Sequence, residues 1–548
     1  MEFSSTANVR SALLTVAEAM GVSEWFVLAT LIAAYLIYRW SIATYGYFDK
    51  RKVPYVKPHP LFGGLWPVFS HLSDVADMGY NMFPENRFSG FFTFRQPGYL
   101  VHDPALAKQI MIKDFDHFTD HMNTISVDVD PIFGRALFFM DGERWRHGRS
   151  GLSPAFTGSK MRNMFTLLSK YVDGAMQRLA QDAGHGEMEL DIRDLFQKLI
   201  NDIITSVSFG VEIDSVHNPN NEFFKRGKQL TAAAGFQGLK FFLLKVIPNS
   251  VFKFFRTRFL SKEVADFYVD VVSKTIKLRE ANKIVRPDFI HLLVQARLNE
   301  LKEDKADDEL KSAGFTTEED IEASTENSQY TDLDITAVAA SFFFGGIDTT
   351  TNLLCFALYE IVGNREVKQK LKAEIDSVRE GLGGKALTYE VLQKMEYLDM
   401  VITESLRRWP PVGFANRVCV KPYTFEDHDG TKVTVEKGQV VQIPMQSFHR
   451  DPKFFPDPYR FDPERFSDEN KHNINQDAFL PFGSGPRNCI GSRLALMQAK
   501  CLLYYFFANF SVEYSNKMDV PIKIRKLSFA YTALNGFWFK LTPRKVTS

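Results

Sequence analysis

Apolar residues recur every three to four positions along much of the chain, which is the pattern of helices that bury one face. Strict alternation is confined to short stretches. Residues 91–101 predict a β-hairpin with Pro97-Gly98 at its turn, and short strands return over residues 521–541. The pattern predicts a mainly α fold with smaller β-sheets. The predicted helices lie at residues 160–183, 191–209, 261–280, 287–298, 334–363, 366–379, 389–408 and 491–510.

An uncharged apolar run lies near the N-terminus, at residues 25–38. With its flanks it approaches the roughly 20 residues that a membrane-spanning helix needs. Trp25 and Trp40 would lie at the two membrane interfaces. Glu18 and Glu24 precede the run, where a cleaved signal peptide would be basic. We therefore expect an uncleaved transmembrane anchor rather than a signal peptide.

Basic residues follow the anchor, at Arg39 and at residues 50–52. The positive-inside rule then places everything downstream in the cytosol. The next stretch holds Pro54, Pro58 and Pro60, which favour a stiff, extended connector. We divide the chain into an N-terminal membrane anchor at 1–46, a Pro-rich hinge at 47–64 and one large body at 65–548.

Two internal segments stand apart from the helical pattern. Residues 301–332 are polar and acidic, which predicts a mobile surface loop. Residues 236–256 are apolar but punctuated by lysine. Burial in the core and a second contact with the membrane both explain that composition.

Composition narrows the function. The 548 residues include 66 Lys+Arg and 66 Asp+Glu, so the net charge is zero, which argues against a general nucleic-acid binder. Only 4 cysteines are present, too few for a disulfide framework, and this favours a reducing compartment. The 50 phenylalanines can fill a large apolar core, an apolar pocket, or both.

The segment Phe482-Gly-Ser-Gly-Pro-Arg-Asn-Cys-Ile-Gly491 is the most informative in the chain. Its glycines and proline allow a tight loop that ends where an apolar helix begins. Free N–H groups at a helix start stabilise a thiolate at Cys489, and Arg487 adds positive charge. That thiolate could be a nucleophile or a metal ligand. No second Cys or His lies at zinc-ligand spacing.

The predicted helix over residues 334–363 contains Gly345-Gly-Ile-Asp-Thr-Thr350, with Thr331 or Asp332 as its N-cap. Two adjacent glycines cost about 1 kcal/mol each inside a helix. They indicate close approach to something flat or bulky, or a local bulge. A close helix crossing with a back-bonded threonine explains the hexapeptide equally well when it is taken alone.

Together these segments resemble the cytochrome P450 family. Its pattern Phe-x-x-Gly-x-Arg-x-Cys-x-Gly is matched at Phe482, Gly485, Arg487, Cys489 and Gly491. The resemblance implies that Cys489 is the axial thiolate ligand of the iron in haem b. It also implies that Arg487 meets a haem propionate and that Phe482 packs beside the sulfur.

The same resemblance assigns roles to residues elsewhere. On the central helix it implies that Gly345 lies against the haem, Thr349 binds the oxygen substrate and Asp348 feeds protons from solvent. Trp145-Arg-His-Gly-Arg149 is similar to the family's propionate-binding helix, and Arg417 is a further candidate for that task.

The family's structural triad is matched at Glu404, Arg407 and Arg465. The Glu-x-x-Arg spacing alone means little, because Glu143 and Arg146 share it by chance. The order of Trp409-Pro-Pro411 and Arg465 after it carries the match. The resemblance implies that the triad serves folding and haem retention rather than chemistry.

The resemblance implies a haem-thiolate monooxygenase that inserts one atom of O₂ into lipophilic small molecules. The chain shows no dinucleotide or flavin fingerprint, so electrons from NADPH would arrive through a separate reductase, with cytochrome b5 as a possible second donor. Segments 54–63 and 404–411 resemble microsomal insect enzymes of the xenobiotic-metabolising clan, anchored in the endoplasmic reticulum membrane. The alternatives are an endogenous lipid or steroid hydroxylase, a reductase-independent haem-thiolate isomerase and a non-catalytic haem sensor.

The last expectations concern the residues that line the substrate pocket and those that contact the reductase. For each of these residues, an ordinary place in the core or on the surface is an alternative explanation. The candidates for the substrate pocket are Phe118, Phe138, Phe139, Phe342, Phe344, Phe529 and Leu534. The basic residues expected to meet the reductase are Arg146, Arg493 and Lys500.

Overall fold

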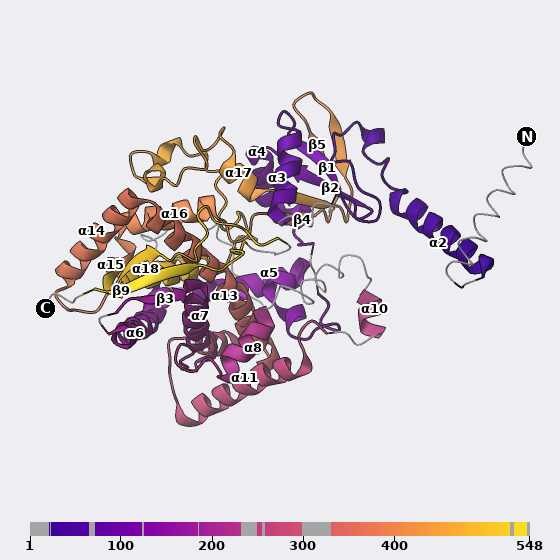
Figure 1. Cartoon of the computed structure of the whole chain (residues 1–548). Coiled ribbons are helices and arrows are strands. Elements are labelled where there is room, and N and C mark those ends of the chain that lie inside the picture. Colours follow the sequence, from indigo (N-terminus) through magenta and orange to yellow (C-terminus); the bar gives the residue numbers. More distant parts are fainter. Residues whose placement is uncertain are drawn as a thin grey trace, which may run out of the picture.

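The computed structural model describes residues 21, 23–64, 72–122, 125–184, 186–231, 249–254, 258–298, 330–526 and 531–544. The predicted fold class is confirmed: helices dominate, and three small sheets accompany them (Figure 1). The helices are α2 Glu24–Ile42, α3 Leu72–Met82, α4 Pro104–Lys108, α5 Gly142–Leu152, α6 Gly158–Ala183, α7 Ile192–Phe209, α8 Glu222–Thr231, α10 Asn249–Phe254, α11 Lys262–Asn282, α12 Phe289–Arg297, α13 Asp332–Gly363, α14 Arg365–Leu382, α15 Tyr389–Gln393, α16 Glu396–Arg408, α17 Met445–Arg450 and α18 Ser492–Asn509.

The strands form three sheets of described residues. The largest has the order β1-β2-β7-β4, with β2 and β7 parallel and its other pairs antiparallel. A second has the order β3-β9-β8, and the third is the hairpin β5-β6. The strands are β1 Phe88–Thr93, β2 Gln96–Val101, β3 Met188–Asp191, β4 Ala415–Val418, β5 Tyr423–Glu426, β6 Lys432–Val435, β7 Val440–Ile443, β8 Phe510–Tyr514 and β9 Trp538–Pro543.

Each predicted helix is present, and one is interrupted. The single helix expected over 389–408 is two, α15 and α16, which Lys394 and Met395 separate. Nothing in the apolar pattern marks this break, because both pieces present buried faces to the same core.

The predicted hairpin exists, but its turn was placed wrongly. Phe94 and Arg95 connect β1 to β2, with Phe94 in the left-handed region at φ 55°. Pro97 pairs with Phe92 inside the ladder, and the parallel pairing with β7 begins only at Gly98. A Cβ at Gly98 would lie 2.8 Å from the Val440 carbonyl oxygen, so this glycine permits close approach of β7.

The C-terminal strands also differ from the expectation. We expected them within residues 521–541, but β8 precedes that stretch and β9 begins at its end. Between them the described residues hold an isolated bridge that joins Ile524 to Ala533. The predicted helix that ends at residue 510 took in only the first residue of β8, and the rest of that strand was not predicted.

Helix α13 runs through the middle of the helical part of the molecule (Figure 1). A capping box begins it: the Thr331 hydroxyl accepts from the Asp334 N–H, and the Asp334 carboxylate accepts from the Thr331 N–H. Its two glycines serve different purposes. A Cβ at Gly346 would come within 2.6 Å of Ile204 in α7, whereas a Cβ at Gly345 would meet no atom within 4 Å. Gly346 therefore permits a close helix crossing, and Gly345 borders open space.

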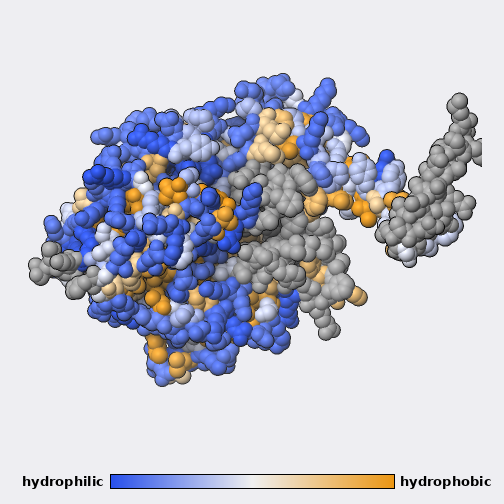
Figure 2. Space-filling model, in the orientation of Figure 1, coloured by the Kyte–Doolittle hydropathy of each residue, from blue (hydrophilic) through white to orange (hydrophobic). Residues whose placement is uncertain are grey.

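Helix α2 projects away from the body (Figure 1), and apolar residues show along it in Figure 2. Its segment Trp25–Ile42 is only 11% buried. Among the described residues it is the one helix long and apolar enough to cross a membrane. This agrees with the expected anchor by length and composition.

The Pro-rich segment after the anchor lies extended along the largest sheet. The Gly90 N–H donates to the Pro54 carbonyl, and the Val56 N–H donates to the Gly90 carbonyl, so the segment adds to the edge of β1. Phe48 is fully buried beneath it. The connector is therefore held against the body.

Three expectations concern residues outside the described part of the chain. The acidic loop predicted at 301–332 is described only from residue 330, and the apolar segment 236–256 only at 249–254. Phe529 also lies outside the described residues. The two explanations of segment 236–256 therefore both stand.

A buried ion pair lies within α16, and further contacts of its two residues connect this helix to the long loop that follows α17. Arg407 Nε and Nη2 donate to the two Glu404 carboxylate oxygens at 2.7 and 2.8 Å, and both side chains are 0% exposed. Burial raises the pKa of Glu404, and the bonds from Arg407 oppose that shift. Arg407 also donates to the His449 and Pro458 carbonyls, and Arg465 Nε lies 3.7 Å from Glu404. The structure thus brings the predicted triad together in the interior.

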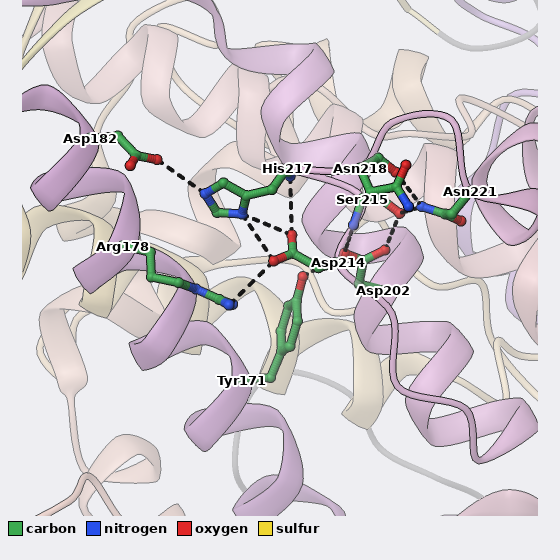
Figure 3. A network of polar contacts seen from close by, with 9 residues as sticks. All are labelled: Tyr171, Arg178, Asp182, Asp202, Asp214, Ser215, His217, Asn218 and Asn221. Atoms are coloured by element: carbon green, nitrogen blue, oxygen red, sulfur yellow. Dashed lines mark hydrogen bonds and ion pairs between the residues drawn. The ribbon is translucent and has the colours of Figure 1, made fainter.

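A polar network fixes the loop between α7 and α8 (Figure 3). His217 lies between two carboxylates, with Nε2 3.1 Å from Asp182 on α6 and Nδ1 2.9 Å from Asp214 in its own loop. On the other side of the loop, the Asp202 carboxylate of α7 is buried and accepts from the Tyr171 hydroxyl at 2.6 Å. The network clamps α6, α7 and the loop to one another, and α7 is the helix that crosses α13.

Glu404→Gln should lower the free energy of unfolding by about 3–5 kcal/mol, because it leaves the Arg407 guanidinium buried without a counter-charge. Urea unfolding followed by tryptophan fluorescence measures the loss. The matched control is Glu143→Gln, whose pair with Arg146 has the same spacing but is 78% and 39% exposed. That control should cost under about 1 kcal/mol. Equal small losses in the two variants would contradict the role given to burial.

His217→Gln should destabilise the protein more at pH 5.5 than at pH 8.5. Asp182 and Asp214 raise the pKa of His217 above its usual value of about 6.5. The stabilisation is therefore complete below that usual value and disappears as pH rises through the raised one. His217 is 40% exposed, so the difference should stay under about 1 kcal/mol. His472→Gln, at an exposed site, serves as control, and a pH-independent difference for His217→Gln would overturn the assignment.

Candidate functional site

The cysteine loop is a tight turn immediately before α18. The Cys489 N–H donates to the Phe482 carbonyl at 2.9 Å, and the Asn488 N–H donates to the Gly485 carbonyl at 2.9 Å. Gly485 has φ 72°, and a Cβ there would lie 2.0 Å from the Met111 carbonyl oxygen. Only glycine fits that position. Cys489 is exposed, three residues before the first turn of α18, whereas the other three cysteines are buried.

His449, which the sequence analysis did not single out, accepts a hydrogen bond from the segment just before this loop. His449 is fully buried, and its Nε2 accepts from the Leu480 N–H at 2.9 Å. Burial, reinforced by nearby Arg407 and Arg450, lowers the pKa of His449 to about 3, so the imidazole stays neutral and its Nε2 stays an acceptor. Because Arg407 holds the His449 carbonyl, the buried ion pair is connected through one residue to the start of the cysteine loop.

Arg149 braces the same loop from α5. Its guanidinium donates to the Asn488 carbonyl at 3.0 Å and to the Asn488 side-chain oxygen at 2.5 Å. It is buried, as is Trp145 one turn earlier. The sequence placed Arg149 at a haem propionate, and in the structure its described bonds go to the residue before Cys489.

Arg487, Arg417 and Trp145 meet beside the cysteine loop. The Arg487 guanidinium carbon lies 4.0 Å from the centre of the Trp145 ring, and Arg487 donates to the Thr119 and Met140 carbonyls. Arg417 is 2% exposed, and its Nε is buried without a partner among the described residues. Three segments far apart in sequence therefore supply one cationic cluster.

The electrostatics of this cluster fit an anionic ligand. Burial lowers the pKa of Arg417 to about 10, and burial together with Arg417 lowers that of Arg487 to about 9. The nearest carboxylate, on Asp120, lies 3.8 Å from Arg487. Buried guanidinium groups held together at a cost in free energy are a site for carboxylates, and a haem presents two. The residues present fit the haem that the resemblance implies.

His121 is a further member of this cluster that sequence reasoning missed. Its Nε2 lies 3.5 Å from Arg417 Nη1, and its ring meets Phe138 edge-on at 5.0 Å. Burial, with Arg417 and Arg487 adding to it, holds the pKa of His121 well below its usual value. No pattern around His121 signals this role, because its neighbours come from a strand almost 300 residues away.

On α13 the predicted acid and alcohol point to different partners. The Thr349 hydroxyl donates back to the Gly345 carbonyl at 2.6 Å, beside the open space at Gly345. Asp348 faces α7, where Arg193 and Gln197 donate to its carboxylate at 3.4 and 3.3 Å. Burial raises the pKa of Asp348, against the opposing effect of Arg193 and Gln197. A carboxyl with a raised pKa is suited to carry a proton.

The aromatic candidates for the pocket separate into two groups. Phe344 lies 5.4 Å from Phe133 and 6.2 Å from Phe139, next to Gly345 on α13, and Phe138 remains 47% exposed. Phe344 is thus adjacent to Gly345, and it packs on Phe133 and Phe139, which are buried in the main core. Leu534 is exposed, and the structure does not connect it to that group.

Two pocket candidates and one reductase candidate were placed wrongly. Phe118 is fully buried in the second core, where it packs on Tyr423 and Phe425. Phe342 packs between Phe156 and Phe289. Lys500 is 2% exposed and pairs with Asp399, because α18 buries nearly all its faces. Of the other reductase candidates, Arg146 is partly exposed and pairs with Asp116 and Glu143, and Arg493 donates to the Phe156 carbonyl.

The comparisons with known proteins agree with this site. The family model described as Cytochrome P450 matches residues 57–538. The chain is 40% identical over 532 residues to "Probable cytochrome P450 9f2" of Drosophila melanogaster, covering 95% of this chain and 99% of that protein. It is 39% identical over 532 residues to "Cytochrome P450 9e2" of Blattella germanica, covering 94% and 96%. It is 32% identical over 513 residues to "Cytochrome P450 6k1" of Blattella germanica, covering 93% and 95%.

The family match spans both the cysteine loop and the central helix, and the insect relatives align along nearly the whole chain. The chain belongs to the cytochrome P450 family and is a haem-thiolate monooxygenase.

Proposed function

We propose that this monooxygenase oxidises lipophilic foreign compounds, such as plant toxins or insecticides. The observation that carries the chemistry is Cys489, exposed at the head of α18 beside a buried cationic cluster. The similarity to insect proteins of the 9 and 6 series supports the insect detoxification setting. The aromatic rings of Phe133, Phe139 and Phe344 supply an apolar lining for such substrates.

In this proposal Cys489 would ligate the haem iron, and Phe482 would pack beside its sulfur. Arg417, Arg487 and the Trp145 indole would hold the propionates, with His121 beside them, while Arg149 fixes the loop through Asn488. When bound, a thiolate-ligated haem supplies the reductive activation of O₂ that places one oxygen atom in the substrate. The protein supplies orientation, exclusion of water and protons.

Protons reach the site through α13. Asp348 takes a proton on the α7 side, where Arg193 is 21% exposed. Thr349 donates its hydroxyl proton to the oxygen substrate on the side of Gly345, and its bond to the Gly345 carbonyl holds the hydroxyl until then. The raised pKa of Asp348 favours the protonated form of this carboxyl, which suits it to replace the proton that Thr349 gives up.

Electrons and location complete the proposal. NADPH would act through a separate reductase, with cytochrome b5 as a second donor. Helix α2 would anchor the chain in the endoplasmic reticulum membrane, with the body on the cytosolic side. The division into anchor 1–46, Pro-rich hinge 47–64 and haem-thiolate domain 65–548 follows from that topology, and Glu404, Arg407 and Arg465 maintain the fold of the third part.

Cys489→Ala should abolish the thiolate-type absorption spectrum of the reduced carbonyl complex, because no other thiol lies at the head of α18. Difference spectroscopy of the reduced protein with carbon monoxide measures this. Cys419→Ala, which removes a buried thiol that donates to the Lys421 carbonyl, should keep the spectrum. A thiolate-type spectrum in the Cys489 variant would show that the ligand is assigned wrongly.

Thr349→Ala should uncouple the reaction. Product formation should fall about 10²-fold, at the low end of what a positioned proton donor contributes, while NADPH consumption continues and yields hydrogen peroxide. The measurement compares product, peroxide and NADPH consumed with a reductase and a panel of lipophilic substrates. Thr336→Ala is the matched control, because the Thr336 hydroxyl makes the same back-bond on α13, to Asp332. Unchanged coupling in the Thr349 variant would remove this residue from the proton path.

A further inference from the structure

A basic hollow lies between the short helix η1 Asp49–Arg51 and strand β6. It has a volume of about 420 Å³, within the roughly 300–1,000 Å³ of small-ligand sites. Four cationic side chains line it against one carboxylate, that of Glu436. The cations are Lys50, Arg51, Lys52 and Lys432. The hollow is distinct from the cationic cluster beside Cys489, with which it shares no residue.

The walls of the hollow are held in place before any ligand binds. Arg51 stacks on the Tyr47 ring at 3.7 Å, and the Tyr47 hydroxyl accepts from Gln439, in the turn that follows β6. Lys52 closes η1 in the left-handed region at φ 57°, which a residue with a Cβ rarely adopts. Phe48, just before η1, is fully buried in the sheet core. The segment with three of the cations is therefore anchored to the wall with the fourth.

The carboxylates nearby compensate the positive charge of the hollow only in part. Lys432 approaches Glu426 at 3.4 Å, but both side chains are more than half exposed, so the pairing is weak. Asp49 accepts a hydrogen bond from the Tyr55 hydroxyl at 3.1 Å and is not among the residues that line the hollow. Lys50 and Lys52 are exposed at the mouth of the hollow.

The hollow also lies close to the foot of the anchor. Helix α2 ends at Ile42, eight residues before Lys50, and it leaves the body near the hairpin β5-β6 (Figure 1). Arg95 lies 4.2 Å from the Trp40 ring, and its carbonyl accepts from the Thr44 hydroxyl at 2.7 Å. These contacts attach the end of α2 to the turn of the hairpin β1-β2. If α2 spans a bilayer, the hollow faces the surface of that bilayer.

We propose that this hollow binds the anionic headgroup of a phospholipid, with phosphate and carboxylate oxygens accepting from Lys50, Lys52 and Lys432. The inference rests on the proposed membrane attachment for its biological setting, though not for its chemistry. Basic residues beside a membrane surface attract anionic lipids, and a preformed hollow adds a fixed geometry to that attraction. Headgroup binding would fix the tilt of the body over the membrane.

The test uses the full chain in a neutral detergent and short-chain phosphatidylserine as the probe, with phosphatidylcholine of the same chain length for comparison. Native mass spectrometry counts bound lipid as its concentration rises. The test variant changes Lys50, Lys52 and Lys432 to Gln, and it keeps Arg51 because that side chain packs on Tyr47. The matched control changes Lys262, Lys274 and Lys385 to Gln, three exposed lysines on and beside other helices.

The unchanged chain and the control should bind phosphatidylserine at least about tenfold more tightly than phosphatidylcholine, and the test variant should lose that preference. High salt should weaken the preference. Equal binding of the two lipids, or an undiminished preference in the test variant, would overturn the proposal. Competition by inorganic phosphate as strong as by the lipid would overturn the lipid in favour of a free-phosphate site. Carbonate extraction from cell membranes tests attachment by α2 separately, because binding in micelles does not depend on it.

Discussion

The buried pair of Glu404 and Arg407 is the constraint on which the rest of the site depends. Both side chains are 0% exposed, so neither charge can be satisfied by water. Arg407 uses its remaining donors on the carbonyls of His449 and Pro458, and the His449 imidazole accepts from the Leu480 N–H. The cysteine loop begins at the next residues. The buried charge of Arg407 thus helps to position the loop that carries Cys489. It does so through two hydrogen bonds, from Arg407 to the His449 carbonyl and from the Leu480 N–H to the His449 imidazole.

The cationic cluster beside that loop differs from the ion pair, because its charges are not balanced within the protein. Burial lowers the pKa of both Arg417 and Arg487, and the charge of Arg417 lowers the pKa of Arg487 further. The ion pair of Glu404 is complete within the protein, whereas this cluster lacks a counter-ion of matching charge among the described residues. An anionic cofactor bound at this cluster would therefore supply stability as well as chemistry, and its presence should favour the folded state. The Trp145 ring covers one face of the Arg487 guanidinium, and this packing helps to fix the orientation of that group.

Local signals in the sequence were sufficient where the physics is local. Thr331 or Asp332 was expected as the N-cap of α13, and Thr331 is the N-cap and forms a capping box. The cysteine loop and the glycine pair were recognised from short motifs. Failures came where distant segments decide the outcome. Gly98 was predicted to lie in a turn, but it permits the close approach of β7. Phe118 was predicted to line the pocket, but it is buried in the sheet core.

The residues missed altogether share one property: their partners come from far along the chain. His449 acts on Leu480, His121 on Arg417, and Arg193 on Asp348. A histidine or arginine in such a position leaves no spacing signal. The same reasoning explains why the segment that follows α2 was predicted to be a simple connector. Its prolines indicate stiffness, but only the structure shows Trp40 against Arg95 and Tyr47 against Gln439. A connector attached at both points fixes the orientation of α2 relative to the body. If α2 anchors the chain as we propose, the anchor also sets how the body faces the membrane.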